Sequence, residues 1–136
     1  MLALCICTQQ ALAQMKEHPD ESHIIHIGSM SGHRMSPGAN GVYGATKFAV
    51  RALTESLHRE MQTAKRPVRV TTISPGLVET GFASNYAGSA DTAEKTYGAL
   101  KCLQSEDIAC AVLYALAQPD HVQIHDILLR PKEQDS

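Results

Sequence analysis

Helical and strand-like segments alternate along this chain of 136 residues, and that alternation constrains the fold more than any other feature. Residues 2–17 carry apolar side chains at helical spacing before Pro19, and a β-branched run follows at 23–28. The same alternation continues with a helix after Asn40, a strand at 68–74, a helix at 106–117 and a strand at 121–129. Strands joined through helices pair in parallel by right-handed crossovers, so the sequence predicts one α/β domain with a parallel sheet.

The two later helices are expected to be amphipathic, and Asn40 is the predicted N-cap of the first of them. Their predicted apolar faces consist of Ala49, Leu53, Leu57 and Met61 on one helix and Ile108, Val112 and Leu116 on the other. These faces either pack on the sheet or, for the first helix, contact a partner chain. Between Glu79 and Lys101 the pattern weakens, which favours short helices or a mobile segment.

Composition excludes several classes of protein. The net charge is −2 and the basic residues are dispersed, so we expect no nucleic-acid binding. The four cysteines have neither CxxC pairs nor a Cys/His spacing typical of zinc, so we expect no metal site and free thiols in a reducing compartment. No window approaches the ~18 apolar residues of a membrane span, and no basic segment precedes the apolar N-terminal residues as in a secretory leader. The expected location is cytoplasmic.

Three chemically interesting features fall at the carboxyl ends of predicted strands, where open parallel sheets place their sites. Ser29 follows the strand at 23–28, Tyr43 opens the next helix, and Pro75-Gly76 follows the strand at 68–74. Lys47 lies four residues after Tyr43, which puts the two side chains on one helix face. Tyr97 and Lys101 have the same spacing but lie far from a strand end, so they are interpreted as an ordinary surface pair.

A phenol, an ammonium and a hydroxyl can form an acid/base centre. The ammonium of Lys47 favours deprotonation of a nearby phenol such as Tyr43, and a serine hydroxyl can hold a carbonyl oxygen while the phenol transfers a proton. These groups supply no hydride, so interconversion of a carbonyl and an alcohol needs a redox cofactor. A serine hydrolase is excluded, because a GxSxG turn starting at Gly28 needs serine where Met30 stands. His23, His26 and His33 show no partner pattern and are expected to have structural or solvated roles.

The segments "IGSMSG", "YGATK" and "ISPGLVET" resemble the catalytic serine loop, the YxxxK helix and the post-strand PG loop of the short-chain dehydrogenase/reductase (SDR) family, in the family's order. The resemblance implies a partial Rossmann-like doubly wound parallel sheet. It implies catalytic roles for three residues, with Tyr43 as acid/base, Lys47 assisting it and binding the nicotinamide ribose, and Ser29 polarising the carbonyl. It also implies that the nicotinamide is flanked by Pro75, Gly76, Val78 and Thr80.

The resemblance further implies NADP, or less favourably NAD, as cofactor, and a small lipophilic carbonyl or alcohol as substrate, such as a steroid or isoprenoid alcohol. It implies a substrate lid after Thr80 and a homo-oligomer in the full-length form of the family. The gap from Ser29 to Tyr43 is one residue longer than the family's commonest spacing, so Ser31 remains a second candidate for the serine role.

The family's glycine-rich turn has no counterpart in these 136 residues. Residues 1–136 are therefore expected to form a single partial domain that lacks the N-terminal nucleotide-binding half, to bind the dinucleotide poorly alone and to be inactive in isolation. A non-catalytic fragment that associates with partner chains is the alternative.

Overall fold

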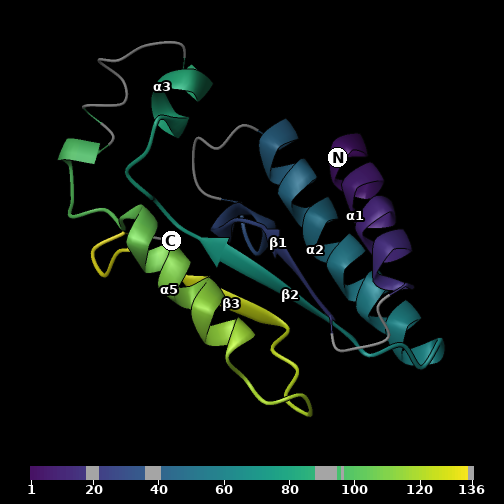
Figure 1. Ribbon diagram of the computed structural model, residues 1–136. Helices are drawn as coiled ribbons and strands as arrows, with labels where there is room; N and C mark the ends of the chain where they lie inside the picture. The colour runs from purple at the N-terminus through teal and green to yellow at the C-terminus, as the bar shows by residue number, and fades with distance from the viewer. Residues whose placement is uncertain (18–21, 36–40, 88–94, 96, 135–136) are drawn as a thin grey trace.

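A three-stranded parallel sheet forms the centre of the computed structural model, which describes residues 1–17, 22–35, 41–87, 95 and 97–134 (Figure 1). The strands are β1 (Ser22–Ile27), β2 (Val68–Pro75) and β3 (Asp126–Leu129), hydrogen-bonded in the order β1-β2-β3. Both strand pairs are parallel. The predicted α/β sheet is confirmed, and β2 occupies its centre.

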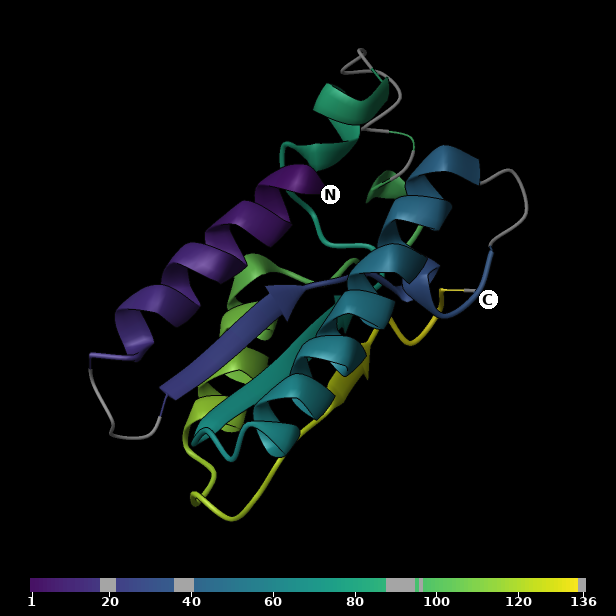
Figure 2. The same cartoon turned by 90° about the vertical axis from the view of Figure 1, so that its right-hand side faces the viewer.

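Helices cover both faces of this sheet, as a doubly wound fold requires. α1 (Leu2–Met15) and α2 (Gly41–Thr63) lie side by side on one face, and α5 (Ser105–Leu116) lies on the other (Figure 2). The connections include the short helices η1 (Met30–Gly32) and α3 (Phe82–Ala87). The core under α1 and α2 consists of Ile24, Leu57, Met61, Val68 and Val70, with Leu12 and Met15 packed against it.

The buried face of α2 differs from the predicted stripe. Leu57 and Met61 are buried as expected, but Leu53 is 37% exposed, while Val50 and Thr54 are buried instead. A residue every four positions drifts by about 40° per step around a helix with 3.6 residues per turn, so a strict four-residue stripe leaves the sheet. The predicted N-cap, Asn40, lies outside the described residues.

α5 packs on the sheet through a face shifted from the predicted one. Ala115 is fully buried, whereas Leu116, which shares the apolar spacing of Ile108 and Val112, is 44% exposed. The guanidinium of Arg69, on β2, donates hydrogen bonds to the carbonyls of Ala115 (3.4 Å), Leu116 (3.4 Å) and Gln118 (3.0 Å). These bonds satisfy carbonyls that the end of a helix leaves without partners, and they fix that end to the sheet.

β3 is shorter than the strand predicted at 121–129, because it begins at Asp126. The side chain of Gln123 occupies the place of a neighbouring strand beside Val70. Its Oε1 accepts from the Val70 N–H at 3.3 Å, and its Nε2 donates to the Val70 carbonyl at 2.6 Å. The side-chain amide therefore replaces the backbone pairing that the β-branched pattern predicted.

None of the helices in the described residues is long and apolar enough to cross a membrane.

Candidate active site

The loops after β1 and β2 leave the same edge of the sheet, because Ile27 pairs with Ile73 in the parallel register. Gly28 continues the pairing, with its N–H donating to the Ile73 carbonyl at 2.7 Å. A Cβ at Gly28 would lie 2.7 Å from Cγ2 of Thr72, so a side chain does not fit there. Glycine thus lets the β1 loop turn closely against β2, which places Ser29 beside the start of the Pro75-Gly76 loop.

Ser29 is the N-cap of η1, with an extended backbone, and its Oγ accepts the N–H of Ser31 at 3.1 Å. Ser31, the second candidate for the serine role, lies two residues further along this turn and donates that hydrogen bond through its backbone N–H. Gly32 closes the turn, with its N–H donating to the Ser29 carbonyl at 2.8 Å. Both serines are half-buried.

Tyr43 and Lys47 lie on one face of α2, as the spacing predicts, with the Lys47 ammonium 5.7 Å from the centroid of the Tyr43 ring. The ammonium also donates to the carbonyls of Gly28 (3.0 Å) and Ile27 (3.3 Å). Burial lowers the pKa of Lys47 from its usual value. An ammonium has three N–H donors, so one remains for a further partner. Lys47 therefore connects the helix that carries Tyr43 to the residue that precedes Ser29.

An aromatic cluster covers Tyr43. Its ring lies 5.8 Å from Phe82 and 5.6 Å from Tyr86, both on α3, and these two rings stack 5.6 Å apart. Phe82 and Tyr86 are 52% and 51% exposed, so each presents an apolar surface beside the phenol. The segment after Thr80 thus contains the predicted short helix and packs directly on the candidate acid/base. Its continuation through residues 88–94 lies outside the described residues.

The loop after β2 forms a backbone bridge with Leu103 through the residues on either side of Val78. The Leu77 carbonyl and the Glu79 N–H bond to Leu103, at 3.1 and 2.9 Å. Such a parallel bridge turns the N–H and C=O of Val78 to the opposite side of the chain from Leu103. The exposed Thr80 accepts the Phe82 N–H at 3.2 Å, so its hydroxyl proton remains available for donation.

Gln134, near the C-terminus, holds this loop and was not singled out from the sequence. Its Oε1 accepts the Leu77 N–H at 2.9 Å, and its Nε2 lies 3.9 Å from Sδ of the buried Met30. A Cβ at Gly76 would lie 2.7 Å from Cβ of Arg130, so the C-terminal segment packs tightly on the loop. No local pattern in the sequence signals this contact, because Gln134 and Leu77 are 57 positions apart.

The second tyrosine–lysine pair has a different environment. The hydroxyl of Tyr97 accepts the N–H of Ala83 at 3.1 Å, and Lys101 is exposed. Tyr97 therefore supports the start of α3. The three histidines interpreted as structural each make side-chain hydrogen bonds: His23 with Thr71, His26 with Thr8 and Thr54, and His33 with Ser74 and Asp126.

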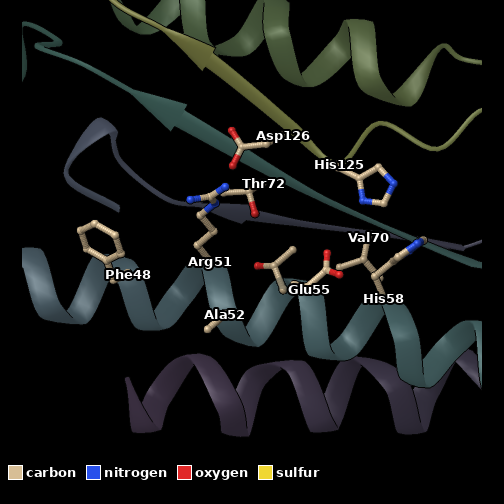
Figure 3. A pocket seen from close by; sticks show the side chains of 10 residues that line it. Phe48, Arg51, Ala52, Glu55, His58, Val70, Thr72, His125 and Asp126 are labelled. Carbon is tan, nitrogen blue, oxygen red and sulfur yellow. The ribbon is translucent and has the colours of Figure 1, made fainter. Parts of the chain in front are cut away.

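A cavity of about 390 Å³ lies between α2 and the β2–β3 side of the sheet (Figure 3). Arg51, Glu55 and His58 line it from α2, and His125 and Asp126 line it from the other wall. Ser29, Tyr43 and Lys47 are not among its lining residues, so this cavity is separate from the candidate active site. The described residues contain no group of three or more side chains placed to hold a metal ion.

Comparison with known proteins identifies relatives along the whole chain. Residues 1–91 match the family model for short chain dehydrogenase. Dehydrogenase/reductase SDR family member 11 of Gallus gallus is 50% identical over all of this chain and 54% of the relative. Farnesol dehydrogenase of Aedes aegypti is 37% identical over 96% of this chain and 51% of the relative. The chain thus spans about half the length of the curated relatives it matches.

The solved structure of serine dehydrogenase in its closed form, complexed with NADP⁺, superposes with a TM-score of 0.86 at 38% identity. The match covers 95% of this chain and 51% of that one. Because the family model accounts for two thirds of the residues and the relatives extend over the remainder, the chain belongs to the short chain dehydrogenase family.

Proposed function

We propose that these residues form the acid/base and nicotinamide end of an NAD(P)-dependent oxidoreductase that interconverts a carbonyl and an alcohol. One observation carries the proposal. The half-buried ammonium of Lys47 lies beside the Tyr43 ring and bonds to the Gly28 carbonyl, directly before Ser29. The Lys47 ammonium therefore connects the Tyr43 ring to the loop that carries the Ser29 hydroxyl.

In the proposed reduction, the phenol of Tyr43 gives its proton to the substrate oxygen as the carbonyl carbon gains a hydride. The Lys47 ammonium stabilises the phenolate that remains, and its burial strengthens that interaction by removing water. The Ser29 hydroxyl donates a hydrogen bond to the same substrate oxygen. In the oxidation these three groups act in reverse, with the phenolate removing the alcohol proton.

A nicotinamide cofactor, when bound, supplies or accepts the hydride. The donors at the strand ends fit its nicotinamide end: the third N–H of Lys47, the outward N–H of Val78 and the hydroxyl proton of Thr80. In this proposal Pro75 and Gly76, which begin the loop after β2, flank the nicotinamide. The NADP⁺ held by the 38% identical serine dehydrogenase favours NADP over NAD here.

The proposed substrate is a small lipophilic carbonyl or alcohol. Phe82 and Tyr86 present exposed aromatic faces next to Tyr43, and α3 would act as the substrate lid. The relative named farnesol dehydrogenase makes isoprenoid alcohols reasonable members of a substrate panel, along with steroids.

A second candidate function is a non-catalytic chain that associates with partner chains. It is favoured by the apolar side chains exposed on α1, where Leu2 is 75% and Ile6 is 49% exposed. We propose a homo-oligomer for the full-length protein, and the free cysteines support a reducing, cytoplasmic location.

The test compares Tyr43→Phe with Tyr114→Phe in the full-length protein, using NADPH-dependent reduction of a panel of lipophilic ketones and aldehydes. Tyr43→Phe is expected to lower kcat by ~10²–10⁴-fold while NADPH affinity stays within about twofold, because the phenol transfers a proton and does not hold the nucleotide. Tyr114→Phe removes the hydroxyl of a tyrosine that is 58% exposed on α5, away from the candidate site, and should keep its turnover. Full turnover in Tyr43→Phe would reject the assigned role, and absence of any reductase or dehydrogenase activity in the parent would favour the second candidate.

A further inference from the structure

Three polar side chains from distant parts of the chain meet behind the Ser29 turn. His33 directly follows η1, Ser74 is the last residue before Pro75, and Asp126 begins β3. His33 Nε2 lies 3.1 Å from Ser74 Oγ and 3.2 Å from Asp126 Oδ2, and Ser74 Oγ lies 3.1 Å from the same carboxylate oxygen. Because Oδ2 of the carboxylate can only accept, the Ser74 hydroxyl and His33 Nε2–H both donate to it.

The carboxylate depends on these two donors. Ser74 is 1% exposed, and Asp126 Oδ1 is buried without a hydrogen-bond partner in the described part of the chain. A carboxylate removed from water is costly unless donors compensate for the lost hydration, so the loss of one donor leaves this group poorly satisfied. The three side chains therefore form a unit in which each member stabilises the placement of the others.

This unit is attached to both loops of the candidate active site. Gly32, next to His33, packs so closely on α2 that a Cβ there would lie 2.7 Å from the Lys47 carbonyl. Ser74 immediately precedes the loop that contains Val78. The Ser29 turn is thus held between α2 on one side and the His33 contact with β2 and β3 on the other.

We propose that His33, Ser74 and Asp126 are positioning residues, which fix the Ser29 turn relative to Lys47 and to the end of β2. The expected effect of these residues on catalysis rests on the proposed function, whereas their effect on the position of the Ser29 turn depends only on the folded chain. These three residues act through Ser29, so disrupting their contacts should reduce kcat more than it changes cofactor affinity.

The first test measures amide hydrogen exchange in the full-length protein and in His33→Phe, His33→Gln and the matched control His121→Phe, whose histidine is exposed. The Gly32 and Arg34 amides, which bond to the Ser29 and Met30 carbonyls, report on the turn. His33→Phe should accelerate their exchange by about tenfold, the effect of losing about one net hydrogen bond, with the β2 amides unchanged. His33→Gln keeps a donor at a similar reach and should restore slow exchange, and His121→Phe should have no effect.

Ser74→Ala provides an independent variant in case the aromatic substitution disturbs folding, because it removes one small hydroxyl and leaves the imidazole in place. Ser74→Ala should also accelerate hydrogen exchange at the Gly32 and Arg34 amides while exchange at the β2 amides stays unchanged. Unchanged exchange in both His33→Phe and Ser74→Ala would overturn the proposal, as would acceleration spread equally over β2.

The second test measures turnover in the same variants. His33→Phe should lower kcat by about tenfold with NADPH affinity within about twofold, and His33→Gln should recover most of kcat. Faster exchange of the turn without any change in kcat would reject the positioning role. If the parent has no oxidoreductase activity, the proposed function fails, while the exchange experiment still decides whether these residues hold the turn.

Discussion

His26 is a buried polar residue in the contact between the sheet and the helices, with 5% of its surface exposed. The Thr54 hydroxyl donates to the Val50 carbonyl at 2.9 Å, so its oxygen accepts from His26 Nδ1–H at 2.8 Å. The other ring nitrogen then accepts from the Thr8 hydroxyl at 3.1 Å. The neutral imidazole satisfies both hydroxyls and links β1 to α1 and α2.

Burial lowers the pKa of His26 from 6.5, which predicts a loss of stability in mild acid. Below pH 6.5 the unfolded chain binds a proton that the folded chain resists, so the free energy of unfolding falls as the pH falls from 6.5 toward the folded-state pKa, and is fully restored above 6.5. Burial also lowers the pKa of His23 and His58, so these residues add to the same trend.

Urea denaturation from about pH 8 to about pH 5 checks this prediction in the parent, in His26→Gln and in the exposed-site control His121→Gln. His26→Gln should be less stable at neutral pH, because one amide cannot keep both hydroxyl contacts. It should also show a shallower dependence on pH than the parent and the control. An equally steep dependence would mean that His26 does not carry the effect.

At the scale of elements, the contact between η1 and α2 depends on the absence of a side chain at Gly32. A Cβ there would meet the backbone carbonyl of Lys47 at 2.7 Å, and backbone at a helix centre cannot move aside easily. At Gly41, the first residue of the same helix, no atom of the described residues lies within 4 Å of the equivalent position. The two glycines therefore form a matched pair for substitution, because an added Cβ would clash with the Lys47 carbonyl at Gly32 and would meet none of the described residues at Gly41.

Gly32→Ala is expected to destabilise the fold by about 1–3 kcal/mol, the usual cost of forcing extra volume into a packed contact. Gly41→Ala should be neutral or stabilising by up to about 1 kcal/mol, because alanine favours helix over the unfolded chain. Chemical denaturation of both variants measures the difference. Equal effects of the two substitutions would contradict the close packing of η1 on α2.

Most elements could be predicted from local sequence because their patterns depend on neighbouring residues. The helices at 2–17 and 106–117 and the strands at 23–28 and 68–74 appear within a few residues of their predicted bounds. The strand at 121–129 was overestimated because the side chain of Gln123 replaces backbone pairing, and no periodicity reveals that exchange.

The candidate site likewise contains residues that local sequence can identify and residues that depend on distant contacts. Ser29, Tyr43 and Lys47 could be proposed because they stand at strand ends and at i,i+4 spacing. The partners of His33 could not, because the contact with Asp126 joins residues 93 positions apart and depends on how three strands align. Gln134 was missed for the same reason, since its partner Leu77 is 57 positions away.

At the scale of the molecule, both edge strands of the sheet lack an outer neighbour in the described residues, because β1 and β3 each pair with β2 alone. Ile24 on β1 is buried under α1 and α2, whereas Ile27 on the same strand is 52% exposed. Unpaired edge groups and exposed apolar residues favour association with another chain.

The 136-residue chain on its own is therefore expected to self-associate or aggregate. Total stability is typically only ~5–15 kcal/mol, and each buried polar group without a partner costs about 1–3 kcal/mol, so little margin remains. Size-exclusion chromatography combined with a denaturation curve tests this expectation. A monodisperse monomer with a cooperative transition would instead indicate a self-sufficient small domain.

The proposed site is divided along the full-length chain. In the proposed function these residues provide the acid/base groups and the nicotinamide end, while the 136-residue sequence contains no glycine-rich turn to bind the pyrophosphate. Titration of NADPH into the 136-residue chain, in samples whose circular dichroism shows folded helices and strands, tests this division directly. The account predicts no saturable binding, and saturable binding at micromolar NADPH would contradict it.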